Sequence, residues 1–228
     1  MIRVASYNMH KAVGTDRRFD PERILQVLHE LRADVVALQE CDGRFGERAS
    51  LLPHAALVAG GWEPVEVARR PHSLGWHGNA LLVRGSTIVR HARALDLPTL
   101  EPRGAVIADL EVDGRPLRIV GMHLDLSGLW RRRQLRAVLA AVHAGGRGGA
   151  AVMMGDMNQW TDRGCLSEFG PGCRLLSTGP SFHALRPMAE LDRIVVTGAV
   201  EVERAGVHHT PLAVKASDHL PVWADLRI

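Results

Sequence analysis

The stretch Ala150-Ala151-Val152-Met153-Met154-Gly155-Asp156-Met157-Asn158 carries the strongest structural signal in the chain. Its first five residues are apolar, a run that is typical of a buried β-strand. Gly155 allows a sharp turn directly after such a strand. We therefore expect Asp156 and Asn158 to lie at a strand end, where their polar groups are presented rather than buried along the strand. Asp and Asn also end strands as ordinary turn formers, so this stretch alone does not define a site.

The same arrangement, a polar residue at the end of an apolar strand, recurs along the chain. Strands are predicted over residues 2–7, 34–39, 65–68, 79–84, 105–112, 116–123, 150–154, 191–196 and 221–227. The chemically useful residues at or near these ends are Asn8, Glu40, His123, Asp125, Asp156, Asn158, Asp192, Asp218 and His219. Asp192 is the most informative, because a carboxylate at the start of an apolar strand is costly to bury unless a cation, a metal or an imidazole pairs with it.

Helical patterns are few. One covers residues 21–31, with Asp20 as its N-cap and Pro21 at its first position, and a second covers about 129–143 and ends at Gly145-Gly146. Many strands with few helices between them predict mixed sheets rather than a βαβ repeat. No internal repeat or long linker divides the chain, and 228 residues suit one domain over residues 1–228.

The composition is that of a soluble globular protein, since 46% of the residues are hydrophobic and no run approaches the roughly 20 apolar residues of a membrane-spanning helix. Met1 leads directly into the first predicted strand, with no apolar signal segment. The three cysteines are odd in number and lack CxxC spacing, which argues against a disulfide framework or a structural zinc site. We therefore expect a cytoplasmic protein, and a monomer.

The formal net charge of +3 rests on arginine, because Lys11 and Lys215 are the only lysines. The planar guanidinium of arginine forms bidentate hydrogen bonds with phosphate, so a phosphate-bearing partner fits this composition. An arginine-rich coding bias gives the same composition without such a partner. The one basic run, residues 131–133 with Arg136, lies on a predicted helix whose solvated face explains it equally well. A nucleic-acid partner is compatible with the chain, but no large basic footprint for one is evident.

Six motifs resemble, in order and spacing, those of the endonuclease/exonuclease/phosphatase superfamily of metal-dependent phosphoesterases. They are Ser6-Tyr7-Asn8, Leu38-Gln39-Glu40, Gly121-Met122-His123, Gly155-Asp156-Met157-Asn158, Leu191-Asp192 and Ser217-Asp218-His219, and they span essentially the whole chain. The resemblance implies a four-layer α/β sandwich, in which two packed, mostly antiparallel mixed sheets are flanked by helices and the site lies at one edge. Small bacterial stand-alone members of the superfamily are the most similar.

The resemblance also implies a metal site and a water-activating pair. Glu40 would be the principal ligand of Mg²⁺ or Mn²⁺, with Asn8 and Asp218 close by, and hard oxygen ligands of this kind suit such cations. Asp156 would orient or deprotonate the attacking water, and Asn158 would hold Asp156 or the phosphate.

Two histidines and two further residues complete the implied site. His219 would contact the phosphate with its ring oriented by Asp192, and His123 would donate to a phosphoryl oxygen or to the leaving group. Asn79 resembles a substrate-side Asn of the family. Arg103 would reach the phosphate, although a solvated Arg is an equally good reading.

The expected activity is hydrolysis of a phosphodiester, either a small molecule or lipid headgroup or a nucleic acid. An Mg²⁺-dependent endo- or exonuclease on DNA or RNA is the alternative. His10 stands where abasic-site nucleases of the family carry Asp, which argues against that particular role. A catalytically inert binding module on the same fold is a second alternative, but such proteins usually lose Glu40, Asp156 or His219, and this chain has all three.

Overall fold

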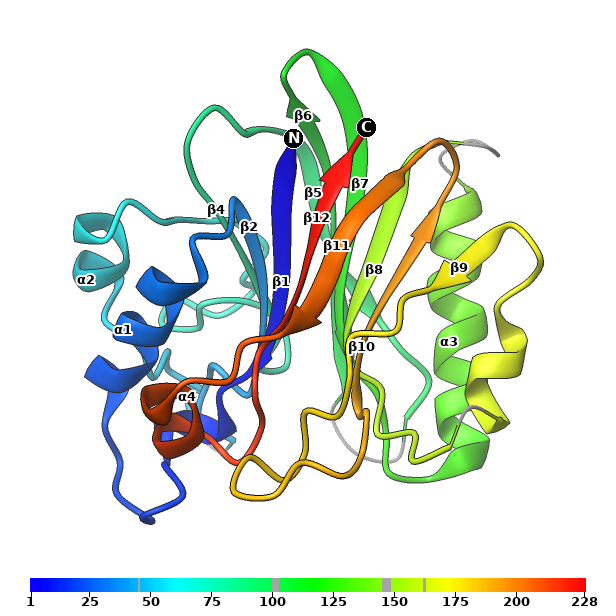
Figure 1. Cartoon of the computed structure of the whole chain (residues 1–228). Coiled ribbons are helices and arrows are strands. Elements are labelled where there is room, and N and C mark those ends of the chain that lie inside the picture. Colours follow the sequence, from blue (N-terminus) through cyan, green and yellow to red (C-terminus); the bar gives the residue numbers. More distant parts are fainter. Residues whose placement is uncertain (45, 100–102, 145–148, 162) are drawn as a thin grey trace.

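Two six-stranded β-sheets pack against each other in the middle of the protein, and helices cover their outer faces (Figure 1). The computed structural model describes residues 1–44, 46–99, 103–144, 149–161 and 163–228. Helices α1 (Pro21–Leu31), α2 (His54–Ala59) and α4 (Pro211–Ala216) lie on one side, and α3 (Gly128–His143) lies on the other. The arrangement is the four-layer α/β sandwich that the motifs imply.

The two sheets have closely related topologies. The first has the order β11 (Glu201–Val207), β12 (Val222–Arg227), β1 (Ile2–Asn8), β2 (Val35–Gln39), β4 (Ala80–Val83) and β3 (Glu63–Pro64). The second has the order β5 (Ile88–Asp96), β6 (Gly104–Val112), β7 (Arg115–His123), β8 (Ala151–Asp156), β10 (Asp192–Thr197) and β9 (Cys173–Leu175). Each contains one parallel pair, β1 with β2 and β7 with β8, among antiparallel neighbours.

This topology determines where the functional residues gather. The carboxyl ends of two parallel strands meet at the same sheet edge, and an antiparallel neighbour begins at that edge. The edge of the first sheet therefore receives Asn8, Glu40 and the segment that leads into β12, while the edge of the second receives His123, Asp156 and the start of β10. Six separate motifs are thus brought to one end of the sandwich.

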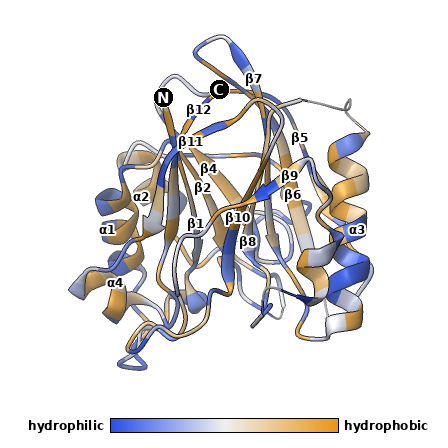
Figure 2. Ribbon diagram, turned by 45° about the vertical axis from the view of Figure 1, so that its right-hand side comes forward, coloured by the Kyte–Doolittle hydropathy of each residue, from blue (hydrophilic) through white to orange (hydrophobic). Residues whose placement is uncertain are grey.

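Three apolar layers hold the sandwich together, one between the sheets and one under each layer of helices. The central layer includes Val4, Val35, Ala37, Ile119, Val152 and Ile194. Because the inner strands are covered on both faces, they are apolar almost throughout instead of alternating. Figure 2 shows that many residues of the two sheets are hydrophobic, whereas part of α3 is strongly hydrophilic. In the part of the chain that the structure describes, no helix is long and apolar enough to span a membrane.

Gly155 has a different role from the sharp turn that the sequence predicts. Strand β8 continues through Gly155 to Asp156, in register with β7. A Cβ at Gly155 would lie 1.8 Å from the carbonyl oxygen of Met122, so no larger residue fits there. Glycine is required by the close approach of the neighbouring strand, and Asp156 is the last residue of the strand.

Several expected elements are confirmed and others differ. Asp20 caps α1 by accepting a hydrogen bond from the backbone NH of Arg23, and α3 matches the second predicted helix, whose expected Gly145-Gly146 end lies outside the described residues. The predicted strand 65–68 is wrong. Strand β3 covers only Glu63–Pro64, and residues 65–68 follow it as an irregular segment whose Val65 and Val67 fill the central core. Strands β5, β9 and β11 and helices α2 and α4 were not predicted. The mixed exposure of β5 and β11 explains why they lack a clear apolar run.

Candidate active site

Asp156 lies at the centre of the polar cluster. The Asn8 side-chain amide donates to its Oδ2 over 3.0 Å, and the backbone NH of Asn158 donates to its Oδ1 over 2.9 Å. The imidazoles of His123 and His219 place Nε2 at 3.4 and 3.8 Å from Asp156 Oδ2. Burial raises the pKa of the Asp156 carboxyl, an effect that the charge of His219 opposes and that of Asp192 reinforces. A buried carboxylate with a raised pKa beside two imidazoles is suited to proton transfer.

The predicted pairing of His219 with Asp192 is present. His219 Nδ1 donates to Asp192 Oδ2 over 2.8 Å, and the hydroxyl of Ser181 donates to the same oxygen over 2.6 Å. Burial alone would lower the pKa of His219, but the negative charge of Asp192, together with Asp156 and Asp218, raises it to about 10. His219 is therefore an imidazolium at neutral pH, with its Nδ1 occupied and its Nε2 directed toward Asp156.

The pKa of His123 is shifted in the opposite direction from that of His219. It is buried, and Arg103 Nη1 lies 2.9 Å from its ring nitrogens. Burial, and then the positive charges of Arg103, His219 and Lys11, keep the pKa of His123 well below its usual value. The two histidines that flank Asp156 therefore differ at neutral pH, one being charged and the other neutral.

The expected metal ligands lie beside this buried cluster. Asn8 accepts a hydrogen bond at Oδ1 from the backbone NH of His10, and His10 Nδ1 lies 3.6 Å from Asp218 Oδ1. Lys11 forms an ion pair with Glu40 Oε2. His10, Lys11 and Ala12 all have positive φ, at 44°, 54° and 59°. Such backbone conformations are uncommon for non-glycine residues, and three in succession indicate a tightly constrained segment beside the site.

Two sets of side chains offer donor atoms for a divalent cation, the buried Asp–His cluster and the expected ligands Glu40, Asn8 and Asp218. One carboxylate and histidine group of the described chain, Asp156, Asp192 and His219, has ligand atoms within 4.8 Å of one another. His219 is a poor ligand in this group, because a metal requires a neutral imidazole with a free nitrogen. Glu40, Asp218 and the Asn8 amide instead offer the oxygen donors that Mg²⁺ and Mn²⁺ prefer.

A cavity of about 240 Å³ opens beside Glu40. Arg103 and His123 line it, together with Lys11, Arg48 and His77. Asn79 does not line it: the side chain is fully buried, and its amide donates to the backbone carbonyl of Gly104 over 3.0 Å. In this geometry Asn79 ties the loop before β4 to the start of β6.

Two other predicted residues, Asn158 and Asp125, make hydrogen bonds in which one of the two partners is a backbone group. The Asn158 side chain donates to the carbonyl of Leu124 over 2.9 Å, so the contact with Asp156 comes from its backbone NH. Asp125 accepts from the backbone NH of Ser127 over 2.8 Å and thus has the role of a turn former. The backbone NH of Asp125 donates to Gln134 of α3, which ties the loop after β7 to that helix.

Two residues at the site, Ser181 and Phe182, were not identified from the sequence, whereas Lys11 was expected to lie near the site without a stated partner. Lys11 contacts Glu40, Ser181 contacts Asp192, and the ring of Phe182 packs on His219 with the ring centroids 4.8 Å apart. The proximity of Lys11 to Asn8 in the chain was a signal for the first of these. Ser181 and Phe182 lie in a long loop with no strand pattern, so only the folded chain identifies them.

The basic run on α3 is engaged within the protein. Arg132 and Arg136 both bind the carboxylate of Glu168, and Arg133 lies over the ring of Trp130. Arg131 donates to the carbonyl of Leu126 and to Gln159. The run therefore stabilises neighbouring loops, and a solvated helix face is the better of the two sequence interpretations.

A buried acid between a charged and a neutral imidazole, near carboxylate and amide oxygens, has the chemical groups that phosphoester hydrolysis needs. The family model described as "Endonuclease/Exonuclease/phosphatase family" matches residues 5–219, and the chain belongs to this family of phosphoester hydrolases. No curated protein matches the sequence at a significant level.

Solved structures share the fold at low sequence identity. An endonuclease/exonuclease/phosphatase from Bacteroides vulgatus superposes with a TM-score of 0.75 at 19% identity, covering 100% of this chain and 98% of its own. The mannosyl-6-phosphatase of Bacteroides thetaiotaomicron gives 0.76 at 18% identity, with 100% of both chains covered. TDP2 of D. rerio, complexed with a single-strand DNA product, gives 0.76 at 16% identity and covers 100% and 99%. The last two of these proteins are named for, or hold, chemically different phosphate compounds, so the fold alone does not define the substrate.

Proposed function

We propose that this protein is a divalent-metal-dependent phosphodiesterase acting on small phosphodiesters or lipid headgroups. The observation that carries the proposal is the position of Asp156, which is held by Asn8 and Asn158 and lies 3.4 and 3.8 Å from two histidines, His123 neutral and His219 charged. Hydrolysis of a phosphodiester needs a base for water, a positive group for the phosphoryl oxygens and a donor for the leaving group. This cluster supplies one candidate for each.

Asp156 is the candidate base. Its pKa is raised by burial, which makes the carboxylate a better proton acceptor than an exposed Asp near neutral pH. Asn8 and the Asn158 backbone each donate to one of its oxygens, and these contacts fix the direction of the carboxylate. Water between Asp156 and the phosphorus atom would be oriented for attack.

The two histidines act on the phosphate. His219, charged and held by Asp192, stabilises negative charge on the phosphoryl oxygens. His123, neutral and buried beside Arg103, donates a hydrogen bond to a phosphoryl oxygen or to the leaving group. Glu40, Asn8 and Asp218 would hold Mg²⁺ or Mn²⁺, which when bound supplies Lewis-acid stabilisation of the phosphoryl oxygens.

The preference for small substrates rests on the cavity and the arginines. The cavity beside Glu40 is about 240 Å³, which suits a phosphate with a small substituent. Arg132 and Arg136 bind Glu168 instead of forming a basic surface for a polyanion. A nuclease is the second candidate, favoured by the structural likeness to a protein that holds a single-strand DNA product. We further propose a single-domain, monomeric and cytoplasmic protein, in accord with its three free cysteines.

The direct test is a substrate panel measured with Mg²⁺, Mn²⁺ or excess chelator. The panel contains bis(p-nitrophenyl) phosphate, glycerophosphodiesters, lysophospholipids, single-stranded DNA and supercoiled plasmid. We expect metal-dependent hydrolysis of small diesters at a rate at least comparable to that of DNA, and weak duplex binding with a shallow dependence on salt. Efficient plasmid nicking with no activity on small diesters would establish the nuclease instead. Full activity in excess chelator would refute metal dependence.

A further inference from the structure

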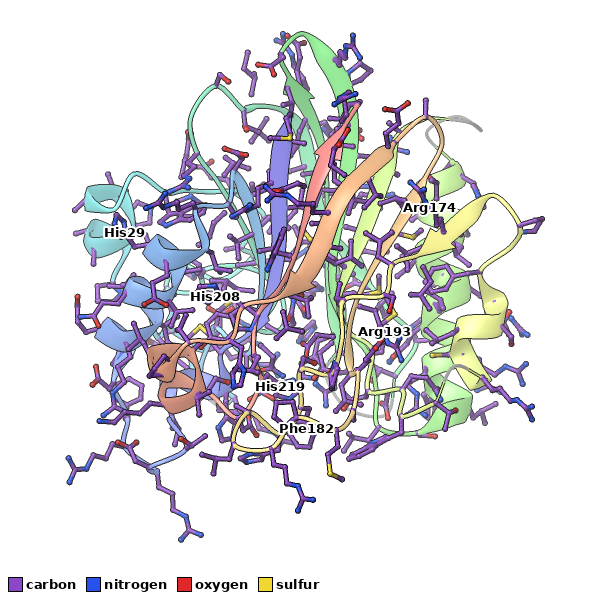
Figure 3. The ribbon with its side chains drawn as sticks, viewed as in Figure 1. His29, Arg174, Phe182, Arg193, His208 and His219 are labelled. Carbon is purple, nitrogen blue, oxygen red and sulfur yellow. The ribbon has the colours of Figure 1, made fainter. Side chains whose placement is uncertain are left out.

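Phe182 is built rigidly onto the catalytic edge. Its ring packs on the imidazole of His219, and Figure 3 shows both residues at the end of the sandwich where the site lies. The backbone of Phe182 exchanges two hydrogen bonds with Ala189, and the preceding residue, Ser181, accepts from the backbone NH of Leu220. The loop that carries Phe182 is therefore tied to the segment that carries His219, and the position of the ring is determined by both.

Trp160 extends this aromatic surface outward. It follows Asn158 by two residues, its ring centroid lies 5.9 Å from that of Phe182, and the two rings are nearly perpendicular at 85°. Trp160 is 64% exposed, although its neighbour Gln159 is buried and accepts a hydrogen bond from Arg131. The segment is thus anchored while the indole stays in water. Single exposed apolar residues are common, but this one continues a row of rings that begins on the catalytic histidine.

We propose that Phe182 and Trp160 form an aromatic subsite that binds a planar aromatic group attached to the substrate phosphate, either an aryl group or a nucleobase. This inference rests on the proposed function and adds the substrate class. The edge-to-face arrangement leaves indole surface available for a further ring, and aromatic groups stack on such faces with a preference that aliphatic groups lack. His219 links the subsite to the phosphate, since one face of its imidazole contacts Phe182 while its Nε2 points toward Asp156.

The subsite can be tested by binding, without any turnover. Calorimetric titration of the Mg²⁺-loaded protein would compare methylphosphonate, cyclohexylphosphonate and phenylphosphonate, which carry a carbon–phosphorus bond and resist hydrolysis. We expect phenylphosphonate to bind the wild-type protein about 10-fold more tightly than methylphosphonate, in the range known for single-ring stacking. Cyclohexylphosphonate has a similar size without a π face and should bind more weakly than the phenyl compound. The phosphonate analogues of thymidine 5′-monophosphate and of deoxyribose 5-phosphate then distinguish a nucleobase from an aryl group.

Variants test whether Trp160 is responsible for the preference for phenylphosphonate. Trp160→Ala should reduce the phenyl preference to about 2-fold while leaving methylphosphonate affinity unchanged, and Trp160→Phe should keep most of the preference. Trp130→Ala is the matched control, because Trp130 lies on α3 under Arg133 and outside the subsite. Because Trp160 is largely exposed, its replacement should leave the thermal unfolding temperature within about 2 °C of the wild type.

The outcomes separate the subsite from the proposed function. No phenyl preference in the wild type, or an equal loss of all three phosphonates in Trp160→Ala, overturns the subsite. Equal affinity for the cyclohexyl and phenyl compounds also overturns it, because the surface would then be merely apolar. A protein that hydrolyses no diester but keeps a Trp160-dependent phenyl preference would retain the subsite and lose the proposed activity.

Discussion

The first and second sheets each contribute half of the candidate site, and the two halves differ in their contact with water. Glu40 and Asp218, at the edge of the first sheet, have side chains that are 22% and 21% exposed. Asp156 and Asp192, at the edge of the second sheet, are 2% and 0% exposed. A partly hydrated edge suits a cation that keeps several waters. A dry edge suits groups whose pKa values must be shifted, because burial and close charges act strongly there.

His219 joins the two halves. It belongs to the segment that leads into β12 of the first sheet, yet its imidazole is bound by Asp192 of the second sheet over 2.8 Å. Asn8 makes the reciprocal contact, reaching from the first sheet to Asp156 over 3.0 Å. The comparison predicts that changes in the buried half affect the chemical step, whereas changes in the exposed half affect the metal.

The largest effect is expected from Asp156→Asn, which removes the proton acceptor of the buried half and keeps its shape. The value of kcat should fall by at least about 100-fold, the low end of the loss for a general base, with substrate affinity maintained. The control is Asp125→Asn, another buried carboxyl with a turn-forming role, which should lower kcat far less. Wild-type turnover in Asp156→Asn would reduce Asp156 to a structural residue.

The next largest effect is expected from Glu40→Gln, which removes a carboxylate from the partly exposed half of the site. The concentration of Mg²⁺ needed for half-maximal activity should rise by roughly 10-fold or more, since a ligand should matter at least as much as the residues that orient ligands. Activity measured across a Mg²⁺ series checks this. Glu47→Gln, at an exposed carboxylate on the following loop, should leave the curve in place. An unchanged Mg²⁺ requirement in Glu40→Gln would remove Glu40 from the metal site.

A smaller effect, visible mainly in the pH profile, is expected from Asp192→Asn. Asp192 is the largest of the charges that raise the pKa of His219 to about 10, so the wild type keeps the imidazolium until the pH approaches that value. Without this charge, burial lowers the pKa, and the alkaline limb of kcat/KM should move down by about one unit or more. An alkaline limb that does not move would show that loss of the charge on His219 does not limit the activity.

The raised pKa of His219 also makes the stability of the folded protein depend on pH. The folded pKa of His219 is raised above its unfolded value of about 6.5. Its contribution to the free energy of unfolding is therefore complete below about pH 6.5 and is lost as the pH rises toward 10. Thermal melts of the wild type and of Asp192→Asn should differ most at the acidic end of this window and converge at its alkaline end.

The smallest effect is expected from Arg132→Ala and Arg136→Ala on α3. Both side chains are exposed and share Glu168, so each substitution should leave the thermal unfolding temperature close to that of the wild type. Activity and the salt dependence of DNA binding should match the wild type. A strong loss of DNA binding in either variant would show that α3 is a nucleic-acid surface and would favour the nuclease.

Local patterns in the sequence were sufficient for the parts of this protein that depend on neighbouring residues. The apolar runs of β1, β2, β7 and β8 are long enough to predict buried strands, and a polar residue at each end predicted where chemistry would gather. Val65 and Val67 alternate as in a strand, which explains the wrong prediction at 65–68, but only the backbone NH of Val65 still bonds to β4, at the carbonyl of Leu81. Edge strand β5 was missed because its exposed residues dilute the apolar signal.

The sequence by itself determined which residue types stand at the strand ends and the apolar content of the layers, because both depend on a few adjacent residues. Only the tertiary structure decided that Lys11 binds Glu40, that Ser181 donates to Asp192, and that the ring of Phe182 packs between those of Trp160 and His219. It also decided the charge states, because the same residue type, histidine, becomes a cation at 219 and stays neutral at 123. The reason is physical: burial and the distance to other charges set a pKa, and both are defined only when segments far apart in the chain meet.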